Sequence, residues 1–201
     1  MAYNSFTLKK AVTSFNLDLQ ETERTFAGRA AVPISRHLVE TLAENVPLAL
    51  AMNTEKARSE LIIANVLLEV RRIFERRISL FSGIEFNVDR ANNLNGFCDF
   101  IIGLSPRQLI LAAPVIAIVE AKNEKILAGL GQCIAEMVAA RKFNQQENSV
   151  VERIYGVVTS GNFWRFLKLE NETLTVDLDD YHIDQVEKIV GVLCAMVRQE
   201  A

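Results

Sequence analysis

Residues 115–122, V-I-A-I-V-E-A-K, are the stretch from which the fold is predicted. They follow Pro114 and begin with five apolar residues, most of them β-branched, which predicts a strand buried on both faces of a sheet. Alternate residues of a strand share a face. Glu120 and Lys122 therefore point the same way, where the strand ends. The stretch predicts a carboxylate and an ammonium group side by side at one end of a central sheet.

A second apolar strand, predicted over 97–104, contains one acid, Asp99, which precedes Glu120 by 21 residues. If the two strands are neighbours, both acids and Lys122 lie close together. Two carboxylates and a lysine in this arrangement can hold a divalent metal against a phosphate and position the attacking water. The pair of strands therefore predicts a site for phosphodiester hydrolysis.

A long helix predicted over 54–77, with Asn53 as its N-cap, presents a further acid. Glu60 lies at the edge of the apolar stripe of this helix, where packing would favour an apolar residue. We expect Glu60 either to face the site or to pair with Lys56 or Arg71 at the surface. The stripe itself consists of Ile63, Val66, Leu67, Val70 and Phe74.

The remaining pattern alternates between strands and helices, which predicts an α/β layer with a central mixed sheet flanked by helices. We expect one domain over 1–201, with an N-terminal extension over 1–53, a core over about 54–170 and a closing helix over 182–198. Helices are also predicted over 5–15, 35–44 and 128–143. Further strands are predicted over 15–19, 84–88, 108–112, 153–159, 164–169 and, as an edge strand, 174–178.

Composition and charge favour some classes of protein over others. With 201 residues, half of them hydrophobic, the chain can bury one sizeable core. Three scattered cysteines, no apparent signal peptide and no apolar run of membrane-spanning length favour a cytoplasmic protein with reduced thiols. The net charge of −3 argues against a general nucleic-acid coat protein, but a nuclease needs only a local basic patch.

These residues together resemble the PD-(D/E)XK nuclease superfamily, the restriction-endonuclease-like fold. Its signature is an acid on the second core strand and (D/E)-x-K on the third, matched here by Asp99 and by Glu120-Ala121-Lys122. Many members have a glutamine on the following helix, matched by Gln132 in G-L-G-Q-C. The segment 157–166, V-V-T-S-G-N-F-W-R-F, also resembles a hairpin in nuclease domains of type I restriction subunits.

The resemblance covers about 54–169 and implies a Mg²⁺- or Mn²⁺-dependent hydrolase that cleaves DNA. It implies that Asp99, Glu120 and the Ala121 carbonyl hold the metal, a hard ion suited to oxygen ligands. Lys122 would orient the attacking water, while Glu60 would complete the acidic pocket. The resemblance is also compatible with a homodimer or with a partner subunit that recognises the target sequence.

Several alternatives stay open from the sequence. The chain can instead be a non-catalytic module that keeps the fold to bind nucleic acid or protein. The acids and Lys122 can form a salt-bridged cluster, although such a buried cluster contributes little stability. Gln132 can be a solvated helix residue. Trp164 and Phe166 are expected to pack in the core rather than stack on bases, and Cys98 is expected to be a buried thiol.

Overall fold

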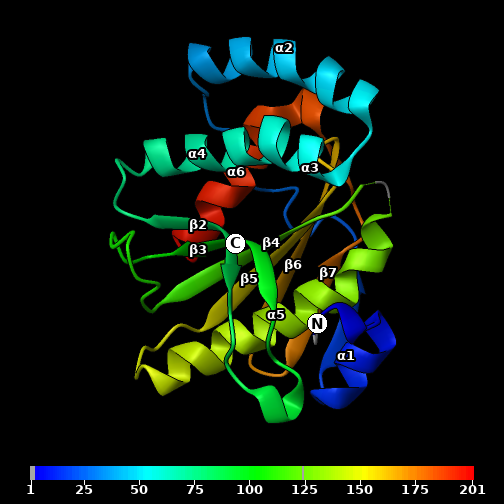
Figure 1. Ribbon diagram of the computed structural model, residues 1–201, viewed down its shortest axis with the longest axis vertical. Helices are drawn as coiled ribbons and strands as arrows, with labels where there is room; N and C mark the ends of the chain where they lie inside the picture. Colours follow the sequence, from blue (N-terminus) through cyan, green and yellow to red (C-terminus); the bar gives the residue numbers. More distant parts are fainter. Residues whose placement is uncertain (1–2, 124) are drawn as a thin grey trace.

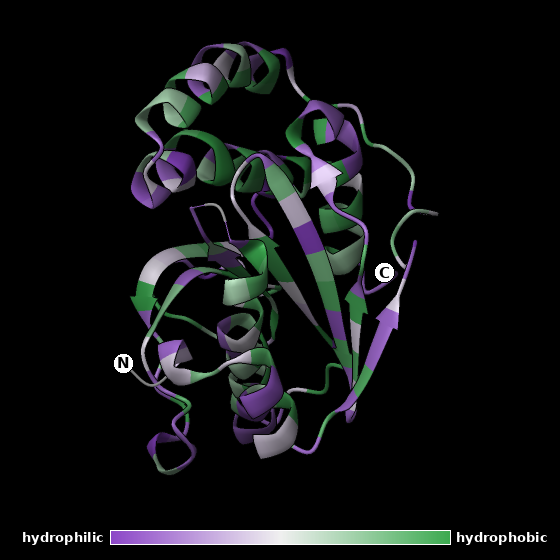
Figure 2. Ribbon diagram, turned by 90° about the vertical axis from the view of Figure 1, so that its right-hand side faces the viewer, coloured by the Kyte–Doolittle hydropathy of each residue, from purple (hydrophilic) through white to green (hydrophobic). Residues whose placement is uncertain are grey.

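The structure, a computed structural model, describes residues 3–123 and 125–201 and contains one mixed sheet between two helical layers (Figures 1 and 2). This confirms the predicted α/β architecture. The eight-stranded sheet has the order β1-β7-β6-β5-β4-β3-β2, and β8 also pairs with β6. The strands are β1 (Asp18–Thr22), β2 (Ser79–Glu85), β3 (Phe97–Gly103), β4 (Val115–Ala121), β5 (Arg153–Thr159), β6 (Phe163–Glu170), β7 (Thr173–Asp177) and β8 (Tyr181–His182).

Helices cover both faces of the sheet, and each layer encloses its own apolar core. Figure 1 shows α2, α3, α4 and α6 on one side and α1 and α5 on the other. A π-helix over Ser59–Ile63 joins α3 to α4. The α-helices are α1 (Leu8–Ser14), α2 (Arg36–Met52), α3 (Glu55–Arg58), α4 (Ala64–Ile73), α5 (Ile126–Gln146) and α6 (Val186–Val197).

Strands β2 to β5 lie next to one another in the sheet. β2, β3 and β4 form an antiparallel meander, and β4 pairs in parallel with β5. A parallel pair needs a crossover connection, which α5 provides. All residues of β4 are buried, as predicted for a strand covered on both faces. The β5–β6 hairpin follows, with its turn at the predicted position.

The long helix differs from its prediction. Thr54, not Asn53, is its N-cap, because the Thr54 side chain accepts a hydrogen bond from the Ala57 N–H at 3.1 Å. Asn53 instead ends α2 in the left-handed conformation, which asparagine tolerates. The π-helix interrupts the run, and α4 ends at Ile73 rather than near residue 77.

Helix α2 continues past Pro47, so its predicted end near that residue is wrong. Pro47 is exposed, and water can solvate the carbonyl that its missing N–H leaves free. Burial of Leu42 and Ala49 on either side holds the helix against the molecule. Tertiary packing therefore outweighs the local signal of the proline.

Helical periodicity places Glu69 opposite the apolar stripe, yet this carboxylate is buried because α2 covers that side of α4. It accepts hydrogen bonds from the Ser35 main-chain N–H at 2.6 Å and from the Ser35 hydroxyl at 2.9 Å. It also pairs with Arg72 at 3.1 Å. Glu69 thereby links α4 to the N-terminus of α2 through hydrogen bonds.

Smaller corrections concern the ends of the chain and one loop. The first helix, predicted from residue 5, begins at Leu8 with Thr7 as its N-cap. Among the described residues of 108–112 there is no strand. β7 is internal rather than at the edge, because β1 pairs with it in parallel. The closing helix begins at Val186, since the residues predicted to open it form β8 and a short 3₁₀ turn.

Candidate active site

The structure brings Asp99, Glu120 and Lys122 together at one end of the sheet. β3 and β4 are antiparallel neighbours, with Phe100 opposite Val119. The Ala121 main-chain N–H donates a hydrogen bond of 2.8 Å to Asp99 Oδ2. The acid of β3 is therefore held against the E-x-K segment of β4.

Glu120 is nearly inaccessible, with 1% of its side chain exposed, whereas 22% of the Lys122 side chain reaches solvent. Lys122 Nζ donates to Glu120 Oε1 in a close ion pair. Glu120 Oε2 is buried and has no hydrogen-bond partner among the described residues. A buried carboxylate oxygen without a partner is costly, so this atom is a position where a cation or a donor would be stabilised.

The electrostatics of the cluster follow from its burial. Burial raises the pKa of Glu120, and the nearby Asp99 carboxylate raises it further against the opposing effect of Lys122. Burial also raises the pKa of Asp99, although the hydrogen bond from Ala121 opposes this. For Lys122, burial acts to lower the pKa, but Glu120 outweighs it and the pKa is raised. Two acids are thus crowded around one ammonium group.

A polar cavity of about 290 Å³ opens beside these residues, between the sheet and the start of the long helix. Asp99 and Ala121 line it from the sheet. The other lining residues are Glu55, Lys56, Ser59, Glu60, Ser82 and Gly83. Helix and strands thus enclose a space rich in carboxylates.

Glu60 occupies the edge of this cavity rather than its centre. Its side chain is 60% exposed and pairs with Lys56 at 2.5 Å, one of the two surface partners expected for it. Its backbone belongs to the π-helix, a rare conformation that is frequent at functional sites. Glu55, in the first turn of α3, also lines the cavity, and its charge acts to raise the pKa of Glu120.

Gln132 is buried, so the solvated alternative is wrong. Its Nε2 donates to Glu136 Oε1 at 3.0 Å. Glu136 is fully buried on α5, and its Oε2 has no partner among the described residues. Burial raises its pKa well above the ordinary value, and the Glu120 carboxylate adds to this. Gln132 and Glu136 therefore lie close to the Asp99–Glu120 cluster, whereas helical periodicity alone indicates only that Glu136 shares a face with Gln132.

The donor set limits how a metal can be held. Within 3–123 and 125–201, no group of three His, Cys, Asp or Glu side chains is placed to hold a metal ion. A metal at Asp99 and Glu120 would therefore have to complete its coordination with a main-chain carbonyl and water. Two carboxylates with additional oxygen ligands suit Mg²⁺, which usually keeps several waters.

The other expectations concern core residues. Trp164 and Phe166 are buried, as predicted. Cys98 is a buried free thiol, as are Cys133 and Cys194. None of the helices over the described ranges combines the length and apolar character needed to cross a bilayer.

Comparisons with known proteins add no relative. No family model matches the sequence, and neither the curated proteins nor the solved structures include one with significant similarity to it.

Proposed function

We propose that this protein is a metal-dependent nuclease that hydrolyses phosphodiester bonds of DNA, built on a restriction-endonuclease-like core. The observation that carries the proposal is the meeting of Asp99, Glu120 and Lys122 on neighbouring strands, with buried Glu120 Oε2 lacking a hydrogen-bond partner among the described residues. The alternative of a purely structural cluster accounts less well for that oxygen, because a stabilising cluster would satisfy it.

The arrangement of elements supports the fold part of the proposal. An acid-bearing helical segment precedes the β2–β3–β4 meander, α5 follows, and β5 joins the sheet in parallel with β4. This is the order of the superfamily core to which the sequence motifs point. β1, α1 and α2 then become additions that extend the sheet and cover its faces.

Asp99, Glu120 and the Ala121 carbonyl would hold Mg²⁺ or Mn²⁺. The ion supplies neutralisation of phosphate charge and activation of a water molecule. Lys122 has no lone pair to bind a metal when charged, but its three N–H groups can orient a water or a phosphate oxygen. With Glu120 holding the ion, the Lys122 ammonium group, which is ion-paired with that carboxylate, would be available to the substrate. Glu55 and Glu60 add negative charge at the mouth of the cavity.

A second candidate function rests on a specific observation. Lys122 is already ion-paired with Glu120, and the described residues contain no three-acid metal group. A module that keeps the fold only to bind nucleic acid or protein would have this closed arrangement. The two candidate functions differ in one measurable property. A nuclease cleaves DNA in a reaction that requires metal and Lys122, whereas a binding module does not cleave DNA.

The test is cleavage of plasmid and single-stranded DNA with Mg²⁺ or Mn²⁺, comparing wild type with Lys122→Met. This substitution keeps the apolar stem and removes the charge. We expect the rate to fall by at least about a hundred-fold, the usual scale for one preorganised electrostatic group. Arg36→Met, at an exposed ion pair on α2, is the matched control and should cut like wild type. Equal cutting by Lys122→Met would assign the activity to another site, and no cutting by wild type would favour the binding module.

A further inference from the structure

A second pocket, of about 460 Å³, lies where α5 begins and β6 starts. Apolar side chains form its walls and charged side chains form its rim. The wall residues are Ile126, Leu127, Ala128 and Phe163, and the rim residues are Lys125, Arg165 and Asp180. None of them belongs to the Asp99–Glu120 cluster.

The pocket lies on the same face of the sheet as Glu120 and Lys122. Glu120 is opposite Val158 of β5, and Val158 is opposite Arg165 of β6. With neighbouring strands about 4.8 Å apart, Arg165 lies roughly 10 Å along this row from Glu120. Helix α5 covers the row, because a Cβ on Gly129 would approach both Val158 and Lys122. Lys122 and the pocket therefore lie at the same end of the sheet, on the face that α5 covers.

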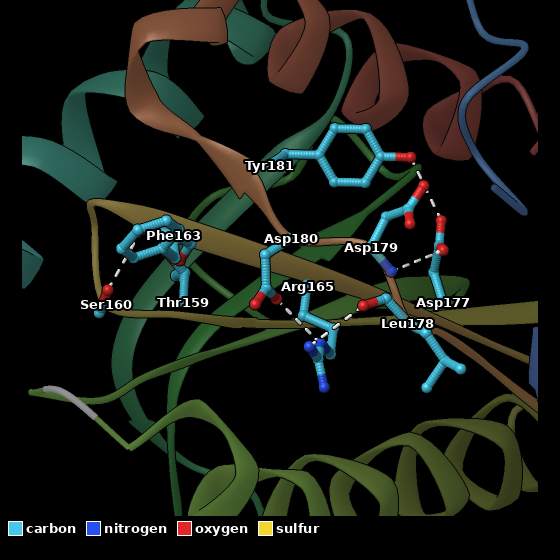
Figure 3. Close-up of polar contacts among 9 residues, drawn as sticks. All are labelled: Thr159, Ser160, Phe163, Arg165, Asp177, Leu178, Asp179, Asp180 and Tyr181. Atoms are coloured by element: carbon cyan, nitrogen blue, oxygen red, sulfur yellow. Dashed lines mark hydrogen bonds and ion pairs between the residues drawn. The ribbon is translucent and has the colours of Figure 1, made fainter. Parts of the chain in front are cut away.

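Phe163 provides an exposed aromatic surface in a fixed position. Its side chain is 43% exposed, unlike its buried neighbour Trp164. Its main-chain N–H donates to Ser160 Oγ at 3.2 Å (Figure 3). Its ring makes an edge contact with His182, at 5.0 Å between centroids. Leu127, which is 67% exposed, lines the same pocket. An exposed ring in a pocket with aliphatic walls is a suitable surface for stacking a flat, apolar-faced group.

The polar groups of the pocket are also fixed. Figure 3 shows Arg165 held between Asp180 Oδ1, at 2.9 Å from its Nε, and the Leu178 carbonyl, at 3.3 Å from its Nη2. The pocket therefore has a guanidinium group and a carboxylate side by side, two groups that can form hydrogen bonds with the edges of nucleobases. A carboxylate repels phosphate but accepts from base N–H groups. Lys125, exposed at the rim, is the group suited to a backbone phosphate.

We propose that this pocket binds one unpaired nucleobase of a single-stranded DNA segment that lies across the Asp99–Glu120–Lys122 cluster. The inference rests on the proposed nuclease function and deepens it by naming the form of the substrate. A base within a duplex is stacked and paired, so it reaches such a pocket only after leaving the helix. Single-stranded DNA presents its bases without that cost.

The experiment measures binding of fluorescein-labelled oligo(dT), and of an abasic strand of equal length, by anisotropy without divalent metal. Wild type should bind oligo(dT) more tightly than the abasic strand. Phe163→Ala should weaken oligo(dT) binding by roughly five-fold to a hundred-fold, as expected for one lost base–aromatic stack, and leave abasic binding unchanged. Phe163→Tyr keeps the ring and should bind like wild type.

Two leucine substitutions form a matched test and control. Leu127→Ala lies in the pocket and should weaken oligo(dT) binding, whereas Leu109→Ala, at a 98% exposed position in the β3–β4 loop, should not. Circular dichroism and melting curves establish that each variant is folded. If Phe163→Ala does not fold, Leu127→Ala still tests the pocket, and Phe163→Tyr and Leu109→Ala are its controls.

The inference is overturned if wild type binds both strands equally, if it binds neither, as a pocket for a peptide would, or if folded pocket variants bind oligo(dT) like wild type. It is separable from the nuclease proposal. Base-dependent, Phe163-sensitive binding without metal-dependent cleavage would support the pocket and contradict the nuclease. Lys122-dependent cleavage, together with unchanged oligo(dT) binding by Phe163→Ala, would support the nuclease and contradict the pocket.

Discussion

Asp99 and Ala121 are joined across two strands by a hydrogen bond of 2.8 Å from the Ala121 main-chain N–H to Asp99 Oδ2. Ala121 lies between Glu120 and Lys122, so this bond ties the acid of β3 to the backbone that carries the other two groups. It also uses one oxygen of the Asp99 carboxylate, while Glu120 Oε2 has no hydrogen-bond partner among the described residues. The predictions below follow from this arrangement and from the buried acids around it.

The first prediction concerns metal binding. Mn²⁺ at a hundred-fold excess over its Kd should stabilise the protein by about 2.7 kcal/mol. For a chain of this size, that corresponds to a rise in Tm of roughly 5–10 °C. Asp99→Asn should abolish the rise, because the amide lacks the negative charge. Glu40→Gln, at an exposed ion pair on α2, should retain it. An equal rise in both variants would place the metal elsewhere.

The second prediction concerns the pH dependence of stability in metal-free buffer. Burial raises the pKa of Glu136 in the folded protein, with Glu120 and Asp99 as its acidic neighbours and Lys122 opposing them. The folded state therefore binds this proton more tightly than the unfolded chain does, and stability falls as pH rises above about 4.5.

Glu136→Gln removes this ionisation and keeps the acceptor for Gln132. At about pH 8 the variant should be more stable than wild type by on the order of 1–3 kcal/mol, and the difference should shrink towards about pH 5. Urea unfolding at the two pH values measures it. Glu152→Gln, at an exposed position, is the control and should show no such difference. A pH-independent effect of Glu136→Gln would contradict burial of a titrating carboxyl.

The third prediction concerns Glu69, which joins α4 to α2. Glu69→Ala leaves the Ser35 N–H and part of Arg72 without their partner. It should cost at least about 2 kcal/mol of unfolding free energy, because hydrogen bonds to charged groups contribute about 1.5–3 kcal/mol each. Glu40→Ala removes an exposed i,i+4 pair and should cost less than about 0.5 kcal/mol. Similar losses in both variants would show that the buried contacts contribute little.

The fourth prediction compares two glycines on α5. A Cβ on Gly131 would collide with the main chain of Phe6 and Thr7, which cannot yield without moving α1. A Cβ on Gly129 would lie 2.7 Å from Val158 Cγ1 and 3.0 Å from Lys122 Cγ, both side-chain atoms. The first substitution should therefore act on stability and the second on the position of Lys122.

We expect Gly131→Ala to lose about 1–3 kcal/mol, the usual cost of overpacking. Gly129→Ala gains about 1 kcal/mol of helix propensity, which offsets part of its clash. It should stay within about 1 kcal/mol of wild type yet cut DNA roughly ten- to a hundred-fold more slowly. Denaturation and cleavage assays on both variants separate the effects. Unchanged cleavage by Gly129→Ala would contradict the role proposed for Lys122.

The sequence by itself determined the elements whose signals are local. The β-branched run before Glu120 predicted β4 as a strand covered on both faces, and the Ser160-Gly161-Asn162 turn predicted the β5–β6 hairpin. The sequence also predicted one acid on each of two apolar strands, and the structure pairs those strands. Strand period and turn chemistry depend on residues close in the chain, so they can be recognised without knowledge of the fold.

Only the tertiary structure decided which faces are covered. Glu69 and Glu136 are buried because α2 packs on α4 and the sheet packs on α5, and α2 passes through Pro47 for the same reason. Glu55 joins the cavity, and Phe163 becomes the exposed wall of a second pocket, through contacts between segments far apart in the chain. Helical and strand periodicities fix which residues share a face, whereas the desolvation that makes a carboxylate reactive depends on what another segment places against that face.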